Sequence, residues 1–182
     1  MNEMRIWCIS DSHFGHDKMV EYCGRPKDFS RQIVSNLSKM CRDDDILIHL
    51  GDICMGEDKY WHNAVIDRLN CKKWLVRGNH DKKSNSWYLA HGWDFVCEQF
   101  TDTYFGKEIL FSHVPQRDNG TFNLNIHGHL HNNLERLKRK EYVTPDEEAR
   151  NIGVVDILTP KHKLIALEFT GYKPVNLNEV LT

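Results

Sequence analysis

Residues 4–13 read MRIWCISDSH, an apolar run that stops at a cluster of acidic, hydroxyl and imidazole side chains. A short apolar run bounded by polar residues predicts a buried strand, here over residues 4–10. The ends of such strands are where open α/β sheets place their sites. Asp11 and His13 are therefore the first candidate site residues.

The same pattern occurs twice more in the first half of the chain. Residues 45–50 (DILIHL) lead into Gly51-Asp52, and residues 73–77 (KWLVR) lead into Gly78-Asn79-His80-Asp81. Between these strands, residues 29–41 and 57–69 have apolar side chains at helical spacing. Strands that alternate with helices predict a parallel sheet with crossover connections.

The second half of the chain contains more strands and fewer helices. Residues 93–105 alternate, and residues 107–111 follow after a Gly106-Lys107 turn, which predicts a hairpin. Further strands are expected at residues 122–126, 151–158 and 163–169, and the basic-then-acidic residues 134–150 are expected to form a surface excursion. This order predicts two mixed sheets packed together with helices outside, in a single domain over residues 1–182.

The bulk composition excludes some classes of protein. The 182 residues carry 24 basic and 26 acidic side chains, so no global charge attracts nucleic acid or an anionic membrane. Six cysteines without a C-x-x-C pair are expected to be reduced thiols. Residues 1–10 do not resemble a signal peptide, and no apolar run is long enough to cross a bilayer. We therefore expect a cytoplasmic protein.

Histidines gather at the predicted strand ends. Of eleven histidines, those in or beside these endings are His13, His16, His80, His113, His127, His129 and His131. Carboxylates together with imidazoles suit manganese, iron, nickel or zinc, and the absence of cysteine from these endings argues against a closed structural zinc site. The pattern predicts an open, catalytic metal site.

The order D-x-H, G-D, G-N-H-D, H and G-H-x-H, from Asp11 to His131, resembles the calcineurin-like metallophosphoesterases. The opening DSHFGH at residues 11–16 and the CGRP at residues 23–26 are similar to small bacterial and phage-type members, as is the YKPV at residues 172–175. The resemblance implies a four-layer αββα sandwich of two mixed sheets. It also implies metal-dependent hydrolysis of a phosphate ester.

The resemblance further implies a division of labour among the site residues. Asp11, His13 and His131 would bind one divalent ion, Asn79, His113 and His129 would bind a second, and Asp52 would bridge the two. A hydroxide between the ions would attack phosphorus, and His80 would protonate the leaving oxygen as general acid. We expect manganese to be the preferred metal, with iron, nickel or zinc as alternatives.

The sequence indicates the substrate-binding residues less clearly than the metal ligands. Asn79, His16 and Arg77 are candidate substrate-binding residues, although Arg77 is equally expected to brace its loop. His127 is expected to pack beside the ligands rather than to bind metal. In the protein Ser/Thr phosphatase branch the second motif continues as G-D-x-V-D-R-G, whereas here it reads GDICMG, so a protein phosphatase is disfavoured. The second Asp of that motif, which orients the catalytic histidine in that branch, is missing here. Asp81 is a candidate to orient His80 in its place.

The favoured function is a phosphodiesterase acting on a nucleotide-like small molecule. A phosphomonoesterase, a nuclease and a non-catalytic binding scaffold of the same fold remain alternatives. The basic run at residues 136–140 gives the nuclease its only local support and would then form a lip that attracts anionic esters. Neither a membrane partner nor a particular oligomeric state is indicated.

Overall fold

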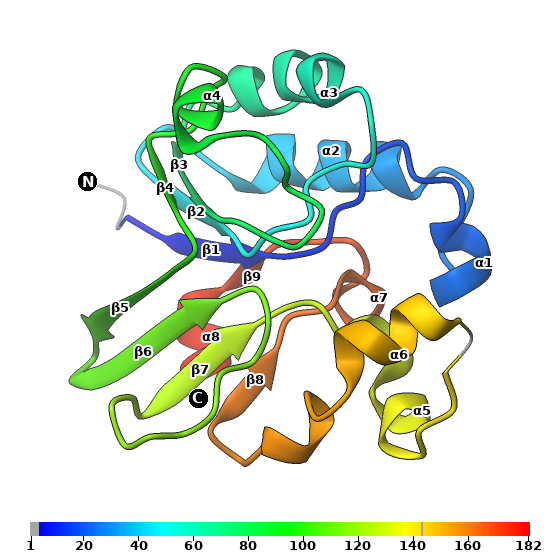
Figure 1. Ribbon diagram of the computed structural model, residues 1–182. Coiled ribbons are helices and arrows are strands. Elements are labelled where there is room, and N and C mark those ends of the chain that lie inside the picture. The colour runs from blue at the N-terminus through cyan, green and yellow to red at the C-terminus, as the bar shows by residue number, and fades with distance from the viewer. Residues whose placement is uncertain (1–3, 143) are drawn as a thin grey trace.

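The computed structural model describes residues 4–142 and 144–182 and contains the two mixed sheets that the sequence predicts (Figure 1). Residues 1–3, part of the segment expected not to be a signal peptide, lie outside the described residues. The strands are β1 (Ile6–Ile9), β2 (Ile46–His49), β3 (Lys72–Val76), β4 (Phe95–Cys97), β5 (Gln99–Tyr104), β6 (Lys107–Ser112), β7 (Leu124–His127), β8 (His162–Leu164) and β9 (Val175–Asn176).

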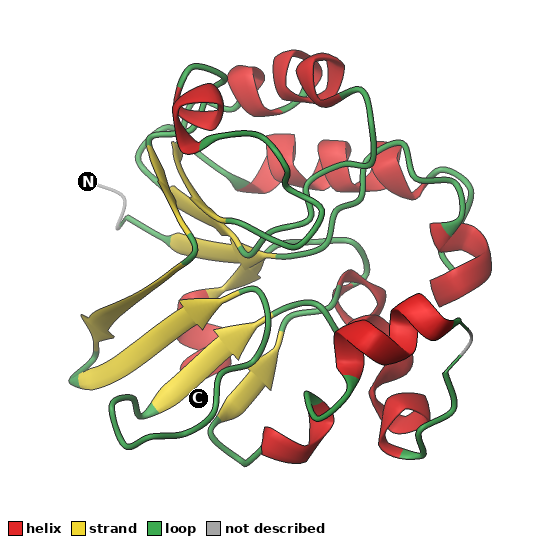
Figure 2. Cartoon of the chain, viewed as in Figure 1, coloured by secondary structure: helices red, strands yellow, loops and turns green. Residues whose placement is uncertain are grey.

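Helices cover the outer side of the first sheet, and further helices lie beside the strand ends of the second sheet (Figure 2). The α-helices are α1 (Met19–Cys23), α2 (Phe29–Met40), α3 (Asp58–Ala64), α4 (Asn85–Leu89), α5 (Leu134–Lys138), α6 (Pro145–Asn151), α7 (Leu167–Thr170) and α8 (Leu177–Leu181). Short 3₁₀ turns are η1 (Ile66–Arg68), η2 (His131–Asn133) and η3 (Val155–Ile157). Within the described residues, none of these helices combines the length and the apolar character needed to span a bilayer.

The first sheet has the order β4-β3-β2-β1-β9, with β1 to β4 parallel and β9 antiparallel to β1. In register, Ile9 lies opposite His49, and His49 lies opposite Leu75. The carboxyl ends of three parallel strands therefore lie next to one another. The loops that follow β1, β2 and β3 begin at the same edge.

The second sheet has the order β5-β6-β7-β8, with β5 antiparallel to β6 and the other neighbours parallel. Ser112 lies opposite His127, so β6 and β7 also end together. In Figure 1 the arrows of β6, β7 and β8 point to the same side as β1. The loops of both sheets therefore meet on one side of the molecule.

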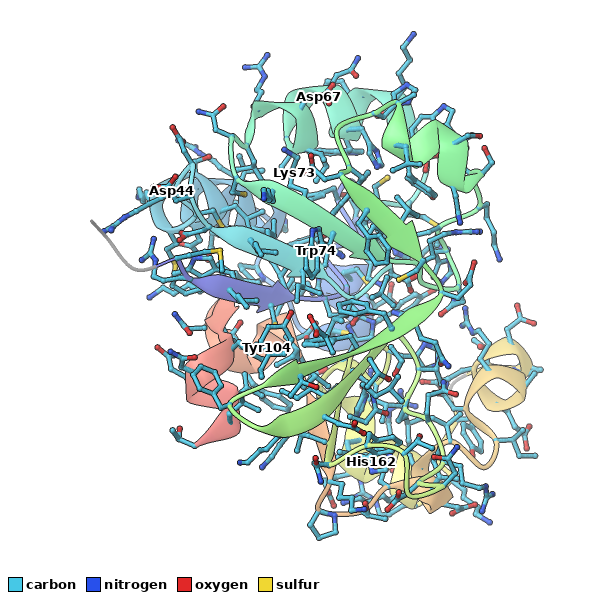
Figure 3. The ribbon with its side chains drawn as sticks, turned by 90° about the vertical axis from the view of Figure 1, so that its left-hand side faces the viewer. Asp44, Asp67, Lys73, Trp74, Tyr104 and His162 are labelled. Carbon is cyan, nitrogen blue, oxygen red and sulfur yellow. The ribbon has the colours of Figure 1, made fainter. Side chains whose placement is uncertain are left out.

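The two faces of the first sheet supply two hydrophobic cores. Leu47 faces the core beneath α2, where Phe29, Ile33 and Leu37 recur at helical spacing, whereas Ile46 and Ile48 face the second sheet. Aromatic side chains fill the space between the sheets, including Trp74 and Tyr104 (Figure 3). Complete burial of one large apolar side chain contributes about 1.5–3 kcal/mol, so these cores hold the strand ends in place.

The predicted hairpin is confirmed as β5 and β6, but residues 93–105 do not form one strand. They divide at Glu98 into β4, which pairs with β3, and β5, which pairs with β6 in the other sheet. Alternation alone cannot show that a strand changes sheets. The predicted helix at residues 57–69 is likewise divided, because Val65 has φ −122° and ψ −62°, outside the helical region.

Two strand predictions in the last third are wrong. Residues 151–158 form the end of α6 and the turn η3, because Thr144 caps α6 and Gly153 adopts a left-handed φ of 74° that interrupts an extended chain. Residues 163–169 are extended only as far as β8. Beyond Leu164 the paired strand β7 has ended, and the backbone satisfies its hydrogen bonds in the helical turn of α7.

Candidate metal centre

Five loops supply the candidate metal ligands, and each follows the carboxyl end of a strand. The loops and side chains are those after β1 (Asp11, His13), β2 (Asp52), β3 (Asn79), β6 (His113) and β7 (His129, His131). The distances between their polar atoms bring all seven side chains together. The strands that carry them end on the same side of the molecule (Figure 1).

The backbone of these loops is held in a sparsely populated conformation. Nine described non-glycine residues have a positive φ, and five of them are candidate ligands: Asp11, His13, Asp52, His129 and His131. A left-handed non-glycine residue costs on the order of 1–3 kcal/mol and persists only where its surroundings enforce it. Such concentration of strain is typical of a functional site.

Two glycines of the motifs, Gly78 and Gly128, lie so close to neighbouring residues that no side chain fits there. A Cβ on Gly78 would overlap the carboxylate of Asp52, and a Cβ on Gly128 would overlap the hydroxyl of Ser10. Only glycine lets these loops lie so near to the acidic side chains. The glycines of G-N-H-D and G-H-x-H are therefore needed for packing around the site.

The first group of side chains lies around Asp11. Its Oδ1 is 3.6 Å from Nε2 of His131 and 3.8 Å from Nε2 of His13. Nε2 of His13 is also 3.6 Å from Oδ2 of Asp52. One ligand atom from each of Asp11, His13 and His131 falls within 4.8 Å of the others, a separation that one cation can span.

The second group lies around His113. Its Nε2 is 3.4 Å from Oδ2 of Asp52 and 3.0 Å from Oδ1 of Asn79. Nδ1 of His129 is 3.2 Å from the same ring nitrogen. Asp52 thus faces His13 of the first group and His113 of the second through the same carboxylate oxygen. This position suits a bridging ligand.

Buried polar atoms of the candidate ligands are left unsatisfied, and one of them, Oδ1 of Asp11, faces the cluster. Oδ1 of Asp11, Nδ1 of His13 and Nε2 of His129 are buried without a hydrogen-bond partner among the described residues. A buried polar atom without a partner destabilises the folded protein unless an ion or a water molecule binds it. Burial lowers the pKa of His13 and lowers that of His129 to about 4, so both rings are neutral at pH 7 and offer lone pairs. The donor set therefore fits divalent metal ions.

His80 lies at the rim of the cluster. Its Nε2 is 4.0 Å from Oδ2 of Asp52, and its ring is 22% exposed, whereas that of His113 is 3% exposed. The backbone N–H of His80 donates to Oδ1 of Asp52 at 2.8 Å. Burial lowers the pKa of His80, the nearby Arg150 lowers it further, and Asp52 opposes both. The ring is therefore positioned beside the ligands and open to solvent.

Asp81 does not orient the His80 ring, which was its expected role. Its carboxylate accepts the backbone N–H groups of Asp52, Gly78 and Ile53 at 2.8, 2.8 and 3.1 Å. Burial and the charge of Asp52 raise its pKa to about 6. Asp81 instead ties together the loops after β2 and β3.

Arg25 and Glu168 form a buried ion pair behind the first group, and no sequence pattern marks Glu168 as part of the site. Nη2 of Arg25 lies 2.7 Å from Oε1 of Glu168, and it donates to the carbonyl of Asp11. Oε1 of Glu168 is 3.4 Å from Nδ1 of His131. Burial alone would raise the pKa of Glu168, but His131 and Arg25 lower it to about 2. The pair orients His131.

The two remaining candidate substrate residues, His16 and Arg77, and the expected packing residue His127 have different surroundings. His16 lies next to the first group, its ring centroid 5.7 Å from that of His13. Arg77 donates to Asn85, to Glu98 and to the carbonyl of Asp81, so it braces its loop. His127 packs against His162, with 6.1 Å between ring centroids, consistent with the expected structural role.

The basic run is largely neutralised within the excursion at residues 134–150. Arg136 pairs with Glu147, Lys138 with Glu135, and Arg139 with Glu141. Each of these side chains therefore has a nearby acidic partner that weakens its field towards solvent. This pairing reduces the support for a nucleic-acid-binding lip.

Comparison with known proteins identifies a family over most of the chain, including all the candidate ligands. The model of the calcineurin-like phosphoesterases matches residues 4–168. An uncharacterized protein of Methanocaldococcus jannaschii is 27% identical over 191 aligned positions, which cover 100% of this chain and 92% of that protein.

Solved structures share the fold. A protein of unknown function from Aquifex aeolicus superposes with a TM-score of 0.70 at 24% identity, over 98% of this chain and 98% of that chain. The alignment with a novel archaeal phosphodiesterase covers 69% of this chain and 73% of that chain, with a TM-score of 0.47 and 16% identity.

Proposed function

The chain belongs to the calcineurin-like phosphoesterase family. We propose that it is a two-metal phosphodiesterase acting on a nucleotide-like small molecule. One observation supports the proposal most strongly. Seven carboxylate, amide and imidazole side chains from five strand-end loops converge, and three of their buried atoms lack a partner among the described residues.

Each group of side chains would hold one divalent ion. Asp11, His13 and His131 would bind the first, Asn79, His113 and His129 the second, and Asp52 would bridge them. When bound, such ions stabilise the charge on phosphoryl oxygens and lower the pKa of a bound water from 15.7 to about 7. Manganese suits this mixed oxygen and nitrogen donor set, with iron, nickel and zinc as alternatives.

His80 would act on the leaving group. Its backbone is fixed by Asp52, and its ring lies at the rim of the ligand cluster, where a substrate oxygen can reach it. A protonated ring there would donate to the departing oxygen. Asn79 precedes it in the same loop and would add an amide contact to the phosphate.

Catalysis is favoured over a binding scaffold because the chain has both the bridging carboxylate and the rim histidine. A scaffold would need neither Asp52 nor His80 in this arrangement. A small diester is favoured over nucleic acid because the neighbouring basic run is largely paired with acidic side chains. A phosphomonoesterase is the rival within the same chemistry.

The test of the function is a panel of phosphomonoesters, cyclic and linear diesters and nucleic acids, assayed with manganese, nickel, zinc and magnesium in turn. We expect hydrolysis of small diesters, loss of activity on chelation and recovery with manganese. Failure to hydrolyse any ester with any of the metals would contradict the proposal.

The role of His80 is tested by the change His80→Asn with two classes of ester. General acid catalysis contributes about 10²–10⁴-fold, and a nitrophenolate needs that proton far less than an alkyl or nucleoside alkoxide does. The variant should therefore lose much more rate on the alkyl esters while keeping the wild-type metal content. Equal losses on both classes, or loss of metal, would contradict the assigned role.

A further inference from the structure

One arginine faces His80 from outside the five ligand loops. Arg150 lies in α6, and its Nη1 is 3.4 Å from Nε2 of His80. Its Nε donates to the carbonyl of Asp146 at 3.1 Å, one turn earlier in the same helix. This hydrogen bond within α6 holds Nε of the guanidinium group, while its Nη1 reaches the rim of the candidate metal centre.

Among the described carboxylates, none forms an ion pair with Arg150. Arg25, Arg77 and Arg136 each form an ion pair, but Arg150 has no such pair among residues 4–142 and 144–182. Its contacts are a backbone carbonyl and a ring nitrogen. A guanidinium with these contacts beside the His80 ring offers N–H donors at the rim of the candidate metal centre, where an anionic oxygen can bind.

The position of α6 is specified by several contacts. Oγ1 of Thr144 accepts the backbone N–H of Glu147 at 3.1 Å, and Pro145 occupies the first turn. The carboxylate of Glu147 pairs with Arg136 of α5, and Nδ2 of the buried Asn151 donates to the carbonyl of Glu147 at 2.8 Å. The pair between Glu147 and Arg136 links α6 to α5, and the other contacts stabilise the helix that carries Arg150.

We propose that Arg150 binds the phosphate group of the substrate, at a non-bridging oxygen beside the leaving oxygen that His80 reaches. The inference rests on the proposed function and adds to it the residue that recognises the phosphate. A planar guanidinium pairs with two oxygens of one phosphate, a geometry that the point charge of lysine does not reproduce. Because Arg150 is outside the ligand groups, it acts on substrate binding and leaves the metal content unchanged.

The test compares wild type with Arg150→Gln, Arg150→Lys and the control Arg139→Gln. Arg139 is an exposed arginine of the same excursion that pairs with Glu141 and contacts none of the candidate ligands. Glutamine and arginine have similar helix propensities, so α6 is preserved. Two quantities are measured on manganese-loaded protein: the affinity for inorganic phosphate by calorimetry, and kcat and KM for bis(p-nitrophenyl) phosphate.

Arg150→Gln should weaken phosphate binding and raise KM by roughly 10-fold or more, with kcat changed much less, because a charge-assisted hydrogen bond is lost. Arg150→Lys should recover part of the affinity, and Arg139→Gln should match wild type. Wild-type phosphate affinity and KM in Arg150→Gln would overturn the inference while the phosphoesterase stands. If wild type hydrolyses no ester, the proposed function fails, and the calorimetry still decides whether Arg150 binds phosphate.

Discussion

At the scale of single residues, Glu168 shows how a site depends on side chains that touch no substrate. The change Glu168→Gln removes the negative charge that pairs with buried Arg25 and leaves His131 a weaker, uncharged acceptor. We expect manganese affinity to fall about 10–100-fold, as for other groups that orient ligands. We also expect a stability loss on the order of 3–5 kcal/mol, since a buried charge is left unpaired.

The matched control for Glu168→Gln is Glu98→Gln. Glu98 also pairs with an arginine, Arg77, but its side chain is 71% exposed, so its loss should cost only about 0–1 kcal/mol. Calorimetric titration with manganese and thermal unfolding compare the two variants. Wild-type metal affinity and stability in Glu168→Gln would show that the ion pair does not support His131.

The protonation of His113 gives metal binding a pH dependence. Burial lowers its pKa, but the Asp52 carboxylate outweighs burial and raises the pKa to about 9 in the metal-free protein. The protonated ring thus stabilises the metal-free fold below pH 6.5, and this contribution is lost as the pH rises through about 9. A cation needs the neutral ring, so metal binding must release this proton.

Between pH 6.5 and 8 the manganese affinity should therefore rise about tenfold per pH unit, which equals 1.36 kcal/mol. The other ligand histidines with lowered pKa values, His13 and His129, are already neutral and add nothing to this slope. Isothermal titration in buffers of different ionisation enthalpy measures the released proton directly. An affinity that is constant across this range would contradict the assignment of His113 as a ligand.

At the scale of elements, the sequence predicts the central strands correctly because they are short, buried and bounded by polar residues. β1, β2 and β3 lie within the predicted segments to within one or two residues, and all seven candidate ligands come together as expected. The order of the motifs is enough to predict this clustering, because parallel strands have their carboxyl ends at the same edge of a sheet. The predictions fail where tertiary context decides, as in residues 151–158.

The same limit explains the missed residues. Glu168 lies in a segment predicted as a strand, and nothing in its neighbours indicates the contact with Arg25, 143 positions away. Arg150 lies in an excursion whose acidic and basic residues look like an ordinary solvated face. The left-handed φ values of Asp11 and Asp52 are imposed by the packing of the loops and cannot be read from propensity.

At the scale of the whole molecule, we propose that residues 1–182 form one cooperative domain. The core between the sheets includes Ile48 of the first and Phe111 of the second, so neither sheet has a complete core alone. The ligand loops also come from both sheets, and a cation that binds only the folded state stabilises both. Heating should give a single unfolding transition that manganese raises; two separate transitions would contradict the proposal.

The proposed mechanism requires two metal ions that share the carboxylate of Asp52. Manganese bound per chain is counted by equilibrium dialysis and elemental analysis in wild type, Asp52→Asn and the control Asp44→Asn, together with hydrolysis by the same samples. Asp44 is exposed and lies just before β2 (Figure 3). Asp52 follows the other end of that strand. We predict two ions in wild type and in Asp44→Asn, and fewer than two, with little activity, in Asp52→Asn. An active wild type that binds fewer than two ions at saturation, or an Asp52→Asn variant that keeps both, would contradict the account.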